Sequence, residues 1–126
     1  MGEQRHSQAL DQRDAIRNLD ALVAEKVMRW EMTQEYGSAT WYKRDDGREV
    51  FVIDVDYTEN PHCFQPSRSI KDAWQVAEKF YIMLTGDTDE GYIATFDLDG
   101  VYYWAEAPTA QLAICFAALK AVGYEV

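Results

Sequence analysis

The stretch GYIATFDLDGVYYWAE, residues 91–106, decides the fold class more than any other part of the chain. Apolar and aromatic residues alternate with polar ones on both sides of Asp99-Gly100. A two-residue Asp-Gly turn between such runs is a strong signal for a β-hairpin. We therefore expect strands over Gly91–Leu98 and Val101–Glu106. Strand alternation places about half of the aromatic residues of this hairpin in a core and leaves the rest for a covering helix or an interface.

A second hairpin is predicted earlier in the chain. Its strands are Ala39–Lys43 and Glu49–Val55, and the turn is Arg44-Asp45-Asp46-Gly47. The second of these strands is apolar on both faces, which is typical of a strand that is covered on both sides. We therefore expect helices on both faces of the sheet.

Three amphipathic stretches alternate with the two hairpins. Apolar residues recur at helical spacing over Leu19–Trp30, Ile70–Leu84 and Leu112–Val122. We expect the first helix to continue to Tyr36-Gly37. The second should begin after a cap at Ser67 or Ser69, and Ser69 with Asp72 resembles a capping box. The third is apolar almost all round, and such a helix is either fully buried or shared with a partner.

The expected fold is α+β, in the order αββαββα. We predict an alpha-beta-alpha sandwich, with a four-stranded, mainly antiparallel sheet from two hairpins covered by three helices. Residues 18–126 form its single domain, and residues 1–17 are polar and predict a flexible or frayed helical arm. Phe116 falls on the last helix where a monomer would more comfortably carry a polar group, so we expect a homo-oligomer.

Charge and composition exclude several classes of function. The 126 residues hold 12 Lys and Arg against 22 Asp and Glu, a net charge of −10. Between Lys79 and Lys120 lie six acidic residues and no Lys, Arg or His, which disfavours direct binding to duplex nucleic acid. No stretch approaches the roughly 18–20 apolar residues of a membrane span, and the polar N-terminus does not resemble a signal peptide. We expect a cytoplasmic protein.

Catalytic and metal-binding signatures do not rise above background. Asp54, Asp56, His62 and Cys63 are residue types that ligate metals, but their spacing matches no zinc site. The run Asp87–Gly91 lacks the further ligands of a calcium loop. His62 and Cys63 are neighbours in an extended loop, where side chains point apart and do not form a catalytic pair. We expect no enzymatic activity, no metal and no cofactor.

The start of the second helix is a candidate site for a small anionic ligand. Hydroxyls, free backbone N–H groups and a cation at the positive end of a helix dipole bind phosphate or carboxylate. The alternative is simple helix capping. The residues predicted for this site are Ser67, Arg68 and Ser69 for phosphate, Arg29 as a second cation, and Trp41 and Phe64 for stacking.

The acidic hairpin is a candidate protein interface. Aromatic residues lie among its carboxylates, and Tyr and Trp are enriched where proteins bind one another. Its negative charge favours a basic host protein as the partner. The residues predicted for this interface are Asp97, Asp99, Tyr102, Trp104 and, on the last helix, Phe116.

Three segments resemble motifs of the phage ABA-sandwich domain family. LDALVAEKVMRW, residues 19–30, resembles its opening motif LVAEKVMGW. PSRSIKDAWQVAEK, residues 66–79, resembles its middle motif, and AICFAALKAV, residues 113–122, resembles its closing motif AICRAALKAV. The chain departs from the family at Arg29 in place of Gly, at Ser69 in place of Asp and at Phe116 in place of Arg.

The resemblance implies a sandwich fold and a phage or prophage origin, and it implies no particular chemistry. Small phage proteins often counter host defence, so we expect a non-catalytic accessory protein that acts in the host cytoplasm by binding. Sequestration of a small nucleotide-like ligand is the first mechanism. An acidic decoy that blocks a nucleic-acid-binding host protein is the second. A structural or replication subunit without a ligand is the third.

Overall fold

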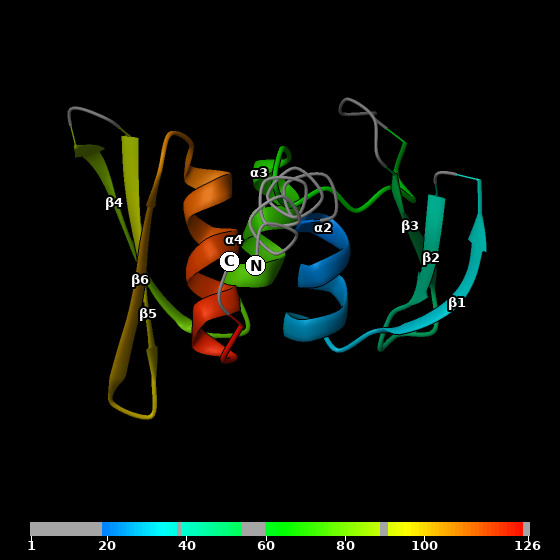
Figure 1. The fold of residues 1–126 in the computed structure, drawn as a ribbon, viewed down its shortest axis with the longest axis horizontal. Helices are drawn as coiled ribbons and strands as arrows, with labels where there is room; N and C mark the ends of the chain where they lie inside the picture. Colours follow the sequence, from blue (N-terminus) through cyan, green and yellow to red (C-terminus); the bar gives the residue numbers. More distant parts are fainter. Residues whose placement is uncertain (1–18, 38, 54–59, 89–90, 125–126) are drawn as a thin grey trace, which may run out of the picture.

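The molecule is a three-layer arrangement with its helices in the middle. The computed structural model describes residues 19–37, 39–53, 60–88 and 91–124. These residues form two three-stranded antiparallel sheets, which lie on opposite sides of the helices (Figure 1). The predicted arm, residues 1–17, and the segment 54–59 lie outside the described residues.

Sheet A is built from β1 (Glu31–Tyr36), β2 (Ala39–Lys43) and β3 (Glu49–Ile53), paired in that order. The predicted bounds of β2 are confirmed, and β3 begins where predicted. The turn between them closes through the amide of Gly47, which donates to the carbonyl of Arg44 over 3.0 Å. Gly47 has a φ of 86°, a value that favours glycine.

Sheet B consists of β4 (Tyr81–Thr88), β5 (Gly91–Leu98) and β6 (Val101–Ala107), again paired in chain order. The hairpin at Asp99-Gly100 is confirmed. These two turn residues have φ values of 54° and 83°, as a tight hairpin with two left-handed central residues requires. The amide of Gly100 also donates to a carboxylate oxygen of Asp97 over 2.9 Å.

The helical layer contains α2 (Leu19–Leu22), which continues as the π-helical segment η1 (Val23–Val27), together with α3 (Ile70–Ala77) and α4 (Ala110–Ala121). The predicted cap of α3 is confirmed, because the Ser69 hydroxyl accepts a hydrogen bond from the amide of Asp72. Thr109 caps α4 in the same way.

The prediction that the first helix continues to Tyr36 is wrong. Arg29 has a φ of 59°, which is left-handed and incompatible with a right-handed helix, so the chain turns directly after η1. The next residues, Glu31–Tyr36, then pair with β2 as a fully exposed edge strand. Arg29 is the position at which the motif of the resembled family has glycine.

The prediction that the second helix reaches Leu84 is also wrong. The amides of Lys79 and Phe80 bond to carbonyls three residues back, which tightens the last turn and ends the helix. The following residues, Tyr81–Thr88, are rich in aromatic and β-branched types and pair with β5. The apolar residues of Tyr81–Leu84 also fit the spacing of a helix, but pairing with β5 makes this segment a strand.

These two extra strands overturn the predicted single four-stranded sheet with helices on both faces. Among the described residues the element order is αβββαβββα, and the described helices lie on one face of each sheet (Figure 1). The physical reason lies in α4, most of whose residues are buried, so the helix belongs in the centre of the molecule. It packs against β5 and β6 on one side and against α3 and η1 on the other.

Strand alternation leaves one face of each sheet turned away from the helices. In sheet B, Ala94, Phe96, Ala105 and Ala107 are buried toward the helical layer, and Phe96 stacks on Phe80 with ring centroids 4.8 Å apart. In sheet A, the buried residues are Tyr42, Val50 and Val52. The residues between them in sequence form the outer faces.

Candidate binding surfaces

The predicted anion site at the start of α3 already holds a carboxylate of the protein itself. The backbone amide of Ser67 donates to Asp20 over 2.8 Å, and the Ser67 hydroxyl donates to the other carboxylate oxygen over 2.9 Å. Asp20, on α2, is only 4% exposed. The pair therefore ties α2 to the entry of α3, and Asp20 occupies the position that a bound phosphate would take.

A second carboxylate strengthens this arrangement. Asp72 accepts a hydrogen bond from the amide of Gln65 over 2.9 Å, so both carboxylates satisfy backbone donors before α3 begins. Burial raises the pKa of Asp20, while the hydrogen bonds from Ser67 and the charge of Arg68 oppose that rise. Burial likewise raises the pKa of Asp72. A ligand phosphate at Ser67–Ser69 would have to displace or neutralise Asp20.

The structure separates the remaining residues predicted for the anionic ligand. Arg29 follows the far end of η1, nine residues beyond Asp20 in the chain, whereas Ser67 bonds to Asp20 itself. Phe64 is buried and packs edge-on against Trp30, with ring centroids 4.8 Å apart. Trp41 lies on the outer face of sheet A, where its ring tilts toward Phe51 at 5.1 Å.

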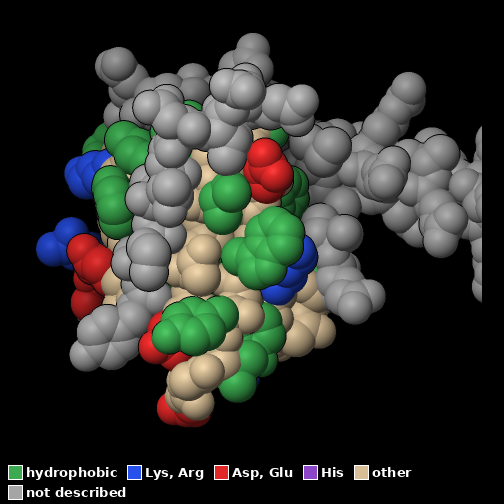
Figure 2. Space-filling view, turned by 90° about the vertical axis from the view of Figure 1, so that its left-hand side faces the viewer, with side chains coloured by type: hydrophobic (Ala, Val, Ile, Leu, Met, Phe, Trp, Pro, Cys, Tyr) green, Lys and Arg blue, Asp and Glu red, His purple; other side chains and the backbone are tan. Residues whose placement is uncertain are grey.

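The acidic hairpin, in contrast, brings most of the predicted interface residues together. Asp97 pairs with Tyr102 and Thr95 with Trp104 across β5 and β6, so their side chains share the outer face of sheet B. Tyr102 is 63% exposed and Trp104 is 57% exposed. Figure 2 looks onto this face and shows hydrophobic side chains gathered beside acidic ones.

Asp99 lies in the exposed turn at one end of this face. Phe116 does not belong to it, because α4 lies beneath the sheet and Phe116 is a half-buried residue packed against the core. Glu106 does belong, since it follows Tyr102 and Trp104 at a spacing of two and pairs with Ile93. The alternation of β6 carries the signal that would have identified Glu106 from the sequence.

The cysteines offer no activated nucleophile. Burial, together with the charges of the nearby Asp72 and Asp20 carboxylates, raises the pKa of the Cys63 thiol to about 11, so this thiol is protonated at neutral pH. Cys115 is fully buried within α4, and burial raises its pKa well above the usual value. Across the described segments, no three His, Cys, Asp or Glu side chains group together as metal ligands would.

Comparisons with known proteins agree with this architecture. A solved structure, that of a phage protein from Bacillus cereus ATCC 14579, is similar, with a TM-score of 0.62 and 26% sequence identity over 87% of this chain and 89% of that one. No curated protein matches the chain. Within the described residues, no helix has the length and apolarity needed to cross a membrane. The sequence model of the phage ABA sandwich domain family matches residues 21–119. The chain therefore belongs to this family of phage proteins.

Proposed function

We propose that this phage protein acts without catalysis, by binding a basic surface of a host protein with the outer face of sheet B. The observation that carries the proposal is the exposure of Tyr102 and Trp104 beside the carboxylates of Asp97 and Glu106. Large aromatic side chains anchor protein interfaces when they become buried there. None of the described helices covers this face (Figure 1).

The charge around these aromatic residues selects the partner. Asp97, Asp99 and Glu106 lie on or beside the face, and the ammonium of Lys120 contacts Trp104. An acidic rim accelerates association with a positively charged partner and discourages wrong partners. Two copies of the same face would repel each other, so this surface favours a basic partner over self-association. The predicted homo-oligomer would have to form elsewhere.

The edge of sheet B is partly closed to strand addition. Lys120 on α4 donates a hydrogen bond from its ammonium group to the backbone carbonyl of Trp104 over 3.0 Å. The same ammonium lies 5.5 Å from the centre of the Trp104 ring. Covering a strand edge with a group from a neighbouring helix is one way in which proteins prevent edge-to-edge pairing. A partner is therefore expected on the face of the sheet, where side chains provide the contacts.

Counter-defence is the role we infer for such a complex. An acidic, aromatic surface resembles a nucleic acid in charge and in stacking groups, so it suits a decoy that fills a nucleic-acid-binding groove. The phage family is consistent with this role. Sequestration of a nucleotide at Ser67 has less support, because Asp20 bonds to the same amide and hydroxyl.

The test compares two variants with equal changes in net charge. Asp97→Lys with Glu106→Lys reverses the outer face of sheet B, while Glu31→Lys with Glu35→Lys reverses charges on the exposed edge strand β1. Each protein is immobilised and exposed to lysate of the host at low salt, and the captured proteins are identified by mass spectrometry.

We expect one basic protein to be captured by the wild type and by the β1 variant and lost with the sheet B variant. Trp104→Ala should weaken capture at salt concentrations that screen exposed charges, because an aromatic anchor does not depend on ionic strength. Equal capture by all variants, or capture of no basic protein by the wild type, would refute the proposal.

A further inference from the structure

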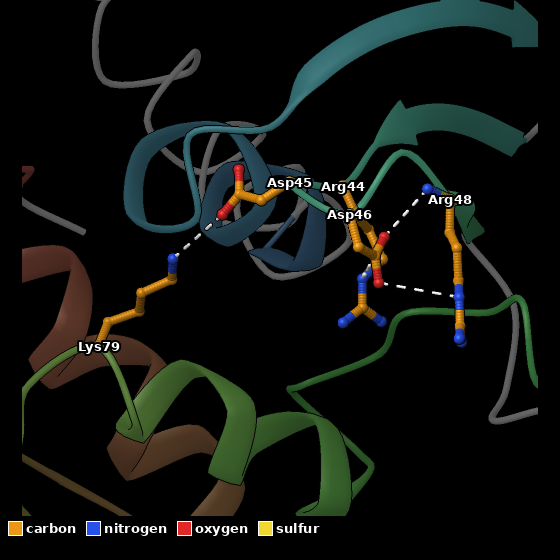
Figure 3. Close-up of polar contacts among 5 residues, drawn as sticks. All are labelled: Arg44, Asp45, Asp46, Arg48 and Lys79. Atoms are coloured by element: carbon orange, nitrogen blue, oxygen red, sulfur yellow. Dashed lines mark hydrogen bonds and ion pairs between the residues drawn. The ribbon is translucent and has the colours of Figure 1, made fainter.

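A hollow of about 330 Å³ lies between the β2–β3 turn and the C-terminal half of α3. The turn contributes Arg44, Asp45 and Asp46, and Trp30 lies at the base. Gln75 and Lys79 line it from α3 and the turn that follows. Figure 3 shows Lys79 reaching across to Asp45, with an ammonium–carboxylate distance of 3.5 Å. This ion pair spans the rim of the hollow.

Two buried polar atoms in the lining make no hydrogen bond to any described residue. They are the Nε–H donor of Arg44 and the Oε1 acceptor of Gln75. The nearest carboxylate oxygen of Asp46 is 3.7 Å from Arg44 Nε, which is too long for a hydrogen bond. A buried donor or acceptor without a hydrogen bond is unfavourable, and such groups are uncommon in folded proteins. A donor and an acceptor left open in one hollow indicate a ligand that satisfies both.

The charges of the lining restrict the ligand. Three carboxylates, those of Asp45, Asp46 and Glu78, outnumber the cations of Arg44 and Lys79. This excess of negative charge disfavours an anion such as phosphate, and the cationic Arg44 with its open Nε–H donor disfavours a cation, so a neutral molecule fits both. The volume lies near the lower end of the roughly 300–1,000 Å³ that is usual for small-molecule sites.

Trp30 shapes the site without offering a stacking face. The guanidinium of Arg44 lies 5.5 Å from its ring centre, and Phe64 packs edge-on at 4.8 Å. These contacts hold Arg44 in place, so its Nε–H is positioned before any ligand arrives. Recognition then depends on hydrogen bonds to an edge of the ligand.

We propose that this hollow binds a neutral nucleobase or nucleoside through its hydrogen-bonding edge. The Arg44 Nε–H donates to a carbonyl oxygen or ring nitrogen, and Gln75 Oε1 accepts from an adjacent N–H. Nucleobases carry such acceptor and donor groups side by side. This site uses sheet A and α3, so it is independent of the partner surface on sheet B.

The test uses the resonance of the Arg44 side chain. The purified, nitrogen-15-labelled full chain is titrated separately with adenosine, guanosine, cytidine and uridine, and the Nε–H signals are followed by NMR. Each nucleoside is added up to about 2 mM, enough to detect a dissociation constant near 1 mM. We expect one nucleoside to shift the Arg44 Nε–H signal in a saturable manner.

Three variants locate the effect. Arg44→Lys keeps the positive charge but removes the Nε–H, and Gln75→Ala removes the acceptor. Each should weaken binding about tenfold or more. Arg48→Lys is the matched control, because Arg48 also contacts Asp46 (Figure 3) but lies outside the lining of the hollow. Its affinity should be unchanged.

Thermal unfolding of each variant shows whether the fold is retained, and the titration of the wild type does not depend on any variant. If no nucleoside shifts the Arg44 signal, the hollow holds water only and the proposal is overturned. If Arg44→Lys and Gln75→Ala bind as tightly as the wild type, the ligand lies elsewhere and the proposal is equally overturned.

Discussion

Replacing Arg29 with glycine should stabilise this protein, although most substitutions of a native residue destabilise. Arg29 follows the first helix, where its φ of 59° reverses the chain into β1. For a residue with a Cβ atom this left-handed conformation is strained, whereas glycine adopts it freely. The family motif has glycine at this position, which fits the backbone that the structure shows.

The magnitude follows from three contributions. Relief of the left-handed strain gains about 1–2 kcal/mol. The greater freedom of glycine in the unfolded chain offsets about 0.4–1 kcal/mol of that gain. Arg29 is exposed, so loss of its side chain should change the free energy of unfolding by no more than about 0.5 kcal/mol. The first two contributions leave a net stabilisation of about 0–1.6 kcal/mol, with a midpoint near 0.8 kcal/mol.

Urea unfolding followed by tryptophan fluorescence measures this difference. Arg29→Ala is the control, because alanine removes the same side chain but retains the strain at positive φ. The glycine variant should be more stable than the alanine variant by about 1 kcal/mol, with equal dependence on urea. If the two variants unfold at the same urea concentration, strain at Arg29 does not govern stability here and the reasoning is refuted.

Three further predictions concern the ends of elements and the buried carboxylate. Gly91→Ala should destabilise the fold by about 2–4 kcal/mol in urea, since the new Cβ would lie 2.2 Å from the backbone oxygen of Ala107. Thr109→Ala should cost about 1 kcal/mol in the same assay by removing the cap of α4. Burial raises the pKa of Asp20 above its usual 3.8. The folded state therefore binds the proton of the Asp20 carboxyl more tightly than the unfolded state does. The stability that protonated Asp20 contributes is lost as the pH rises through its pKa in the folded state. Wild-type stability should therefore gain from this group as the pH falls from about 7 through the raised pKa. Asp20→Asn, which keeps an oxygen acceptor for Ser67, should reduce that gain.

The sequence predicted the parts of the fold that depend on neighbouring residues. The Asp99-Gly100 turn, the strand Ala39–Lys43 and the Ser69 cap were all identified correctly, because turn chemistry and caps act over a few residues. The apolar character of the last helix also indicated that it is buried, and α4 is the centre of the molecule.

The sequence was insufficient where a segment fits two structures locally. Tyr81–Leu84 has apolar residues that suit either a helix or a strand, and pairing with β5 decides for the strand. Glu31–Tyr36 has no buried side chain to indicate a strand, and it becomes one because the chain turns at Arg29 beside β2. Both outcomes depend on partners more distant in the chain than a local pattern can include.

The candidate sites also differ in whether local sequence or tertiary structure determines them. Composition and alternation alone placed Asp97, Tyr102 and Trp104 on one acidic, aromatic face, because a strand fixes which side chains point the same way. Only the tertiary structure brought Asp20 to the amide and hydroxyl of Ser67, 47 residues away. Only packing placed Arg44 and Gln75 in the lining of one surface hollow. Sequence determines what each short segment prefers, and burial, which depends on the whole chain, decides which polar groups meet and which remain open for a partner.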